Sequence, residues 1–187
     1  MHITKTFYAK TRAEWRKWLK ANYKKEKEIW LIYYKKSTGK PRVDYNDAVE
    51  EAICFGWIDG QAKGINKESF AQRYTPRRPK SPYSQMNKER LRHMIEMKKV
   101  APEILAVAEK AFGDAFVFPK DILRAIEKNP KAWEHFEKFS DRYKRIRLSY
   151  IDGARKRPDE FKKRLNNFIK ATEKNKQFGF GGTEHYF

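Results

Sequence analysis

The sequence is poor in the residues on which several structural classes depend. It contains one cysteine, Cys54, which excludes an internal disulfide framework and a cysteine-based zinc site. Residues 1–7 hold no apolar run resembling the core of a signal peptide, and no stretch of ~20 apolar residues occurs that could span a membrane. These absences favour a reducing compartment, and we expect a cytoplasmic protein.

Motifs for common chemistries are also missing. The chain has no Gly-x-Ser-x-Gly element, no Walker loop and no dinucleotide fingerprint. Cys54 lies between the apolar Ile53 and Phe55, which favours a buried inert thiol over a nucleophile. The four histidines are scattered, with no pair at metal-ligand spacing. We therefore expect no metal and no cofactor, and the sequence leans away from an enzyme.

Acidic residues are scarce relative to basic ones. Lys and Arg number 43 against 24 Asp and Glu, which gives a formal net charge of +19. Such a charge attracts phosphates, nucleic acid and anionic headgroups, although many small basic proteins carry it for solubility alone. Residues 63–99 hold eleven basic and three acidic residues, so part of the excess is local.

The N-terminal part of the chain mixes helical and strand patterns. Phe, Tyr and Trp make up 15% of the sequence, which opposes global disorder. Thr11 and Glu14 form a capping box before an amphipathic pattern, and short apolar or alternating runs follow. These patterns predict helices over 11–23 and from Asn46 to Gly56, and strands over 28–34, 57–60 and 69–75, with a turn at Asp59 and Gly60.

From residue 84 onward the apolar spacing is helical. We therefore predict an α+β fold with a small antiparallel N-terminal sheet and helices, followed by an all-helical C-terminal half. The predicted division is an α+β module over 1–83, a helical module over 84–176 packed on it, and a flexible aromatic and glycine-rich tail over 177–187. Docking of that tail through Phe178, Phe180, Tyr186 and Phe187 is the alternative.

Several uncommon strings follow one another in a fixed order. The string EEAICFGWIDG at 50–60 precedes FAQRYTPRRPKSPYS at 70–84 and Asn87. Upstream lie EIWL at 28–31 and YNDAV at 45–49, and downstream lies YIDGARKRP at 150–158. In these strings, from about residue 7 to residue 176, the chain resembles the YdeI/OmpD-associated, bacteriocin-protection family. Where family members commonly place Trp before the serine, this chain has Tyr83, which keeps an aromatic side chain.

The resemblance implies a role in protection against bacteriocins or antimicrobial peptides, or in envelope stress. It implies no particular reaction, so any activity has to be argued from the residues themselves.

The segment from Arg73 to Ser84 carries the strongest binding signal. Its prolines stiffen a loop that holds guanidinium groups beside hydroxyls, and the start of a helix near Ser84 adds backbone N–H groups, a combination suited to phosphate or carboxylate. The predicted ligand-binding residues are Trp57, Asp59, Arg73, Tyr74, Thr75, Arg77, Arg78, Lys80, Ser81, Ser84 and Asn87.

Each of these residues also has a purely structural interpretation. Arg77 and Arg78 could pair with acidic residues of the chain and lock the loop onto the fold, with Asp44, Asp47, Glu50 and Asp59 as the candidates. Asp59 could act as an acid or base, or form an Asx turn before Gly60, which is the more frequent role. Trp57 could stack on a planar ligand, although a strand tryptophan more often belongs to the core.

Three hypotheses of function follow. The first is a non-enzymatic stress-protection protein that binds an anionic small molecule or phosphate group at the basic proline-rich loop. The second is a nucleic-acid-binding protein that uses the two basic regions of the chain as one surface. The third is an enzyme of unknown reaction on an anionic substrate, with Asp59 as acid or base and an arginine as electrostatic stabiliser.

Overall fold

The computed structural model describes residues 2–79, 81–113 and 115–179. The chain divides into two compact units. Unit 1 consists of Met1–Tyr83 and Arg90–Ala111, and unit 2 consists of Ser84–Glu89 and Phe112–Phe187. Residues 90–111, which the sequence prediction assigned to the helical module, therefore belong with the sheet.

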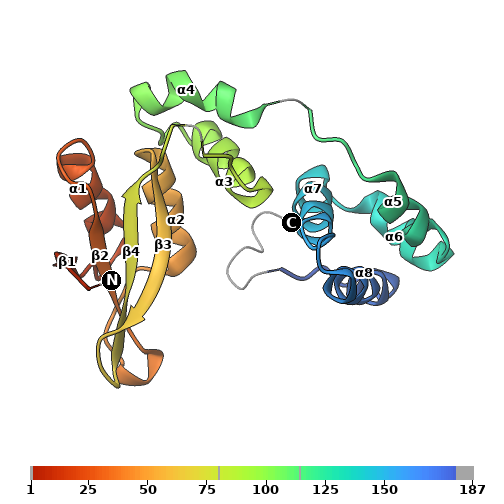
Figure 1. The fold of residues 1–187 in the computed structure, drawn as a ribbon, viewed down its shortest axis with the longest axis horizontal. Coiled ribbons are helices and arrows are strands. Elements are labelled where there is room, and N and C mark those ends of the chain that lie inside the picture. Colours follow the sequence, from red (N-terminus) through yellow and green to blue (C-terminus); the bar gives the residue numbers. More distant parts are fainter. Residues whose placement is uncertain (1, 80, 114, 180–187) are drawn as a thin grey trace. The chain divides into compact units, whose positions relative to one another are not determined.

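Unit 1 is built on a four-stranded sheet in the order β1-β2-β4-β3 (Figure 1). Its strands are β1 (Thr6–Phe7), β2 (Ile29–Tyr34), β3 (Trp57–Gly64) and β4 (Ser69–Pro76). The β2–β4 and β3–β4 pairs are antiparallel, but β1 pairs with β2 in parallel. The predicted α+β class is confirmed, whereas the sheet is mixed and not purely antiparallel.

Two helices cover one face of this sheet. They are α1 (Arg12–Asn22) and α2 (Tyr45–Cys54), and a short 3-10 turn, η1 (Lys36–Thr38), precedes α2. Trp15 of α1 packs on Tyr74 with ring centres 5.2 Å apart, and Trp18 packs on Trp57 at 5.9 Å. The face that receives these indoles carries alternate residues of the strands, as the two-residue period over 69–75 predicts.

Helices α1 and α2 are joined by partly buried ion pairs. Arg12 Nε lies 2.6 Å from Glu51 Oε1, and Arg16 Nη1 lies 2.6 Å from Glu51 Oε2. Arg12 also reaches Asp47 at 2.6 Å and Glu50 at 3.0 Å. Because Glu51 is 1% exposed, its charge depends on these guanidinium partners.

The helical spacing after residue 84 produces two helices that follow β4 in the sequence. These are α3 (Gln85–Glu96), whose residues up to Glu89 belong to unit 2, and α4 (Pro102–Phe112). The start of α4 is tied to the end of α2 by the Ala101 N–H, which donates to the Cys54 carbonyl at 2.9 Å. Arg16 Nη2 also donates to the Lys99 carbonyl at 2.7 Å.

Unit 2 is helical in its described residues, in agreement with the predicted C-terminal half (Figure 1). Asn129 and Ser140 cap two of its helices through their side chains. Its core gathers Ile122, Phe136 and Phe168 among other buried residues. The helices are α5 (Lys120–Glu127), α6 (Pro130–Lys138), α7 (Asp141–Asp152) and α8 (Pro158–Glu173).

The first residues of the predicted tail are packed. Phe178 contacts the core of unit 2, with its ring centre 6.5 Å from that of Phe168. Phe180, Tyr186 and Phe187 lie outside the described residues. In the part of the chain that the structure describes, no helix combines the length and apolar character needed to cross a bilayer.

Candidate functional site

The loop after β4 is shaped by Arg77. Its backbone N–H donates to the Gly56 carbonyl at 2.8 Å, which ties the loop to the end of α2. Its guanidinium Nη2 donates to the carbonyls of Ser81, at 3.0 Å, and Pro82. The guanidinium carbon also lies 3.6 Å from the centre of the Tyr83 ring. The Arg77 side chain therefore holds the start of the loop against Ser81, Pro82 and Tyr83.

The charge of Arg77 has no acidic partner among the described residues. Burial lowers the pKa of its guanidinium, and the Nε atom is buried without a hydrogen-bond partner. Two of the carboxylates considered as partners, Asp47 and Glu50, bind Arg12, and Asp59 accepts a hydrogen bond from Tyr45. The clamp predicted for this loop thus uses carbonyl oxygens and an aromatic ring in place of carboxylates.

Arg78 differs from its neighbour. Its side chain is exposed and makes no hydrogen bond or ion pair with any described residue. Its carbonyl accepts the Ser81 N–H at 3.0 Å. Ser81 is also exposed, and Lys80 lies outside the described residues.

Two predicted binding residues belong to unit 2. Ser84 Oγ accepts the Asn87 N–H at 3.3 Å, which is the bond of a helix N-cap at the start of α3. Thr75 stays in unit 1, where it pairs with Ile58 on β3 and is half-buried.

Three further predicted residues belong to strands and bind other groups of unit 1. Trp57 is 1% exposed and donates its indole N–H to the Tyr23 carbonyl at 3.1 Å. The hydroxyl of the buried Tyr74 is 3.0 Å from that of Tyr33. Arg73 Nε donates to Glu28 Oε2 at 2.7 Å, so this arginine already holds a carboxylate.

Asp59 lies inside a strand, and the turn predicted at Asp59 and Gly60 is wrong. Strand β3 continues to Gly64 and accommodates the extra residues as a β-bulge between Asp59 and Ala62. Asp59 Oδ2 accepts the Tyr45 hydroxyl at 2.6 Å. Burial and this carboxylate raise the pKa of Tyr45, which keeps the phenol protonated as the donor.

Cys54 and His135 are accounted for by the fold. Cys54 is fully buried, and burial raises the pKa of its thiol to about 12. His135 Nδ1 lies 2.9 Å from the Thr172 carbonyl. Within residues 2–79, 81–113 and 115–179, no group of His, Cys, Asp and Glu side chains is arranged to hold a metal ion.

The sequence did not lead us to predict the aromatic partner of Arg77 in the loop after β4. Tyr83 was treated as an aromatic anchor and not as a binding residue, yet it forms the platform for Arg77. An aromatic residue in the same proline-rich loop as an arginine is the signal for such stacking. The Gly56 carbonyl that receives the Arg77 N–H carries no sequence signal, because any residue supplies a carbonyl.

The fold is that of a two-unit α+β protein. Comparisons with known families give one match in the N-terminal part of the chain and one in the C-terminal part. Residues 7–107, more than half of the chain, match a family described as "Domain of unknown function (DUF8412)". Residues 115–175 match the family described as "Bacteriocin-protection, YdeI or OmpD-Associated". No curated protein and no solved structure matches the chain significantly.

The chain therefore belongs to the family of that domain of unknown function, and its residues 115–175 match the model of the YdeI/OmpD-associated, bacteriocin-protection family. The resemblance recognised from the sequence is confirmed by the second match. Most of the strings that suggested it, at 28–31, 45–60 and 70–84, lie in the segment matched by the first.

Proposed function

We propose that this protein is a non-enzymatic stress-protection protein that binds a phosphate- or carboxylate-bearing group at the loop 76–83, with Arg78 as the main contact. The proposal rests on one contrast within unit 1. Arg12, Arg16 and Arg73 each hold at least one carboxylate. Arg77 and Arg78 are adjacent, and neither binds a carboxylate of the described residues.

Adjacent uncompensated arginines give the loop a local positive potential that an anion would neutralise. An exposed guanidinium offers a planar set of N–H donors to phosphate or carboxylate oxygens. The exposed Ser81 hydroxyl adds a neutral donor close by in the chain.

Arg77 has a supporting role in this proposal. Its bonds to the Ser81 and Pro82 carbonyls and its contact with Tyr83 hold the loop in one shape. A loop that is already ordered loses less conformational entropy when a ligand binds. Arg77 thus sets the position of Arg78, and its own positive charge adds to the potential that attracts an anion.

The lone thiol supports the proposal that the protein acts in the cytoplasm, because reduced cysteine is typical of that compartment. Protection would then follow from capturing an anionic molecule or group inside the cell. The match of residues 115–175 to the bacteriocin-protection family supports a stress role of this kind.

Calorimetric titration of the full chain with inorganic phosphate and pyrophosphate tests the proposal. Arg78→Ala should weaken binding by about tenfold, the loss expected when one charge-assisted contact is removed. Lys67→Ala, which removes an exposed charge from the same unit, is the control and should bind as the parent protein does. Equal affinity in the Arg78→Ala variant would refute the proposed site.

A short oligonucleotide serves as a second probe, because the net charge of +19 also favours polyanions. If nucleic acid is the partner, affinity should fall steeply with salt and should weaken similarly in the Arg78→Ala and Lys67→Ala variants. That pattern, with no phosphate binding, would replace the small anion by nucleic acid as the ligand.

A further inference from the structure

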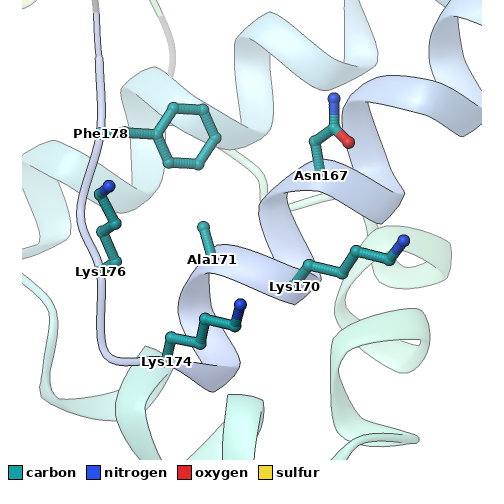
Figure 2. Close-up of a pocket in the computed structure, with 6 residues that line it drawn as sticks. All are labelled: Asn167, Lys170, Ala171, Lys174, Lys176 and Phe178. Carbon is teal, nitrogen blue, oxygen red and sulfur yellow. The ribbon is translucent and has the colours of Figure 1, made fainter.

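Unit 2 carries a pocket at the end of α8, separate from the loop of unit 1. It has a volume of about 400 Å³ and is lined by Asn167, Lys170, Ala171, Lys174, Lys176 and Phe178. In Figure 2 the three lysines stand around Ala171, with the Phe178 ring facing it from the segment after the helix. Lys170 belongs to the last turn of α8 and Lys174 is its C-cap residue, so these two lysines, four residues apart, lie on the same side of the helix end.

The lining combines positive charge with an apolar floor. It contains three lysines and no carboxylate, and none of these lysines forms an ion pair with a described residue. Ala171 and Phe178 supply the apolar surface, and the lysine stems extend it. Such a lining suits a ligand that is itself part anion and part hydrocarbon.

A buried cation contacts the aromatic residue of the pocket. Arg147 of α7 is 3% exposed, and its guanidinium carbon is 4.1 Å from the centre of the Phe178 ring. It binds no carboxylate of the described residues, and its Nε has no hydrogen-bond partner. Burial lowers the pKa of Arg147, and nearby Arg164 adds to this effect. A buried charge without an acidic partner is rare, so an anion nearby would stabilise it.

The pocket is also preformed. The Tyr143 hydroxyl donates to the Phe178 carbonyl at 3.2 Å and accepts the Phe178 N–H at 3.1 Å. These bonds fix the backbone of the segment that carries the aromatic wall. Phe178 therefore lines the pocket and also contacts Arg147 with its ring.

We propose that this pocket is a binding site for a small organic anion, a carboxylate or phosphate ester with an aromatic or short alkyl body. Lys170, Lys174 and Lys176 bind the anionic group. Phe178 and Ala171 contact the hydrocarbon part, and Arg147 adds positive potential from beneath the ring. This site is independent of the anion site proposed in unit 1.

Titration of the full chain with naphthoate and with its neutral analogue naphthamide tests the proposal. The double variant Lys170→Ala/Lys174→Ala should bind naphthoate about tenfold more weakly, because two favourable charges are lost from the rim. The double variant Lys156→Ala/Lys162→Ala removes the same charge from exposed positions of unit 2 outside the pocket and should bind as the parent does. Naphthamide should bind more weakly than naphthoate to the parent protein.

Three results would overturn the proposal. They are no naphthoate binding at all, an equal loss of affinity in both double variants, and equal affinity for naphthoate and naphthamide. The Arg78→Ala variant separates the two sites, because it should leave naphthoate binding unchanged. Circular dichroism verifies that each variant is folded.

Discussion

The Tyr143 hydroxyl bonds to both backbone groups of Phe178, donating to its carbonyl at 3.2 Å and accepting its N–H at 3.1 Å. Tyr143 lies in α7 and is fully buried, whereas Phe178 follows the last helix. One phenol therefore holds the chain segment that leaves α8 against the core of unit 2.

The variant Tyr143→Phe keeps the ring and removes both hydrogen bonds. We expect a loss of about 1–2 kcal/mol in the free energy of unfolding, because two backbone groups lose their partner. Urea denaturation measures this loss, and hydrogen exchange at the Phe178 amide should become faster. Tyr34→Phe is the control, since the Tyr34 hydroxyl has no hydrogen bond with the described residues, and its unfolding midpoint should stay unchanged. Unaltered exchange at Phe178 in Tyr143→Phe would contradict the assigned role.

Gly56 is required by the junction between α2 and β3. Its φ of +71° lies in the left-handed region, and a Cβ atom there would come within 2.7 Å of Ile104 Cδ1. Gly56→Ala should therefore destabilise the protein by roughly 2 kcal/mol in thermal or urea unfolding. The matched control is Gly64→Ala, where a Cβ meets nothing within 4 Å, and its effect should stay within about 0.5 kcal/mol. Equal effects of the two substitutions would argue against strain at Gly56.

The hydrogen bonds of Glu28 should make the stability of the protein depend on pH. Hydrogen bonds from Thr4 and Arg73 lower the pKa of this carboxyl below its ordinary value of 4.5. A lowered folded-state pKa stabilises the protein at pH values above the ordinary pKa, and this contribution is lost as the pH falls through the lowered one. Glu28→Gln should thus reduce stability at neutral pH, by less than about 1 kcal/mol for a partly exposed pair.

The difference between the parent protein and Glu28→Gln should shrink as the solution is acidified, which urea unfolding at several pH values measures. Glu68→Gln is the comparison, because the exposed Glu68 lies 3.9 Å from Lys40 Nζ and makes no closer ion pair with a described residue. A stability difference for Glu28→Gln that is constant at every pH would show that its charge is not responsible.

Local signals predicted the main elements of the fold. The Thr11 side chain accepts the Glu14 N–H at 3.2 Å, as the capping box requires, and β4 follows the alternation over 69–75. Strand β1 was missed because two residues carry no periodicity. The start of α2 was also misjudged, since Asp44 is its N-cap and Asn46 instead accepts a hydrogen bond from Arg90.

The candidate site was less predictable, because it depends on tertiary contacts. A basic proline-rich string identifies the loop, but it does not distinguish Arg77, which folds back onto carbonyl oxygens, from the exposed Arg78. The pairing of Arg73 with Glu28 joins residues far apart in the sequence. The pocket of unit 2 was overlooked because its aromatic wall, Phe178, falls in the segment predicted to be flexible.

The distribution of indoles has a practical consequence for spectroscopy. Trp15 stacks on Trp18 at 5.3 Å, Trp18 meets Trp57 at 5.9 Å, and Trp30 also belongs to unit 1. Of the five tryptophans, Trp133 alone belongs to unit 2. Ultraviolet emission therefore comes mainly from the sheet-containing unit, and replacing Trp133 by phenylalanine turns intrinsic fluorescence into a reporter of that unit alone. Comparing such emission with far-ultraviolet dichroism, which helices dominate, would reveal whether the two units melt together.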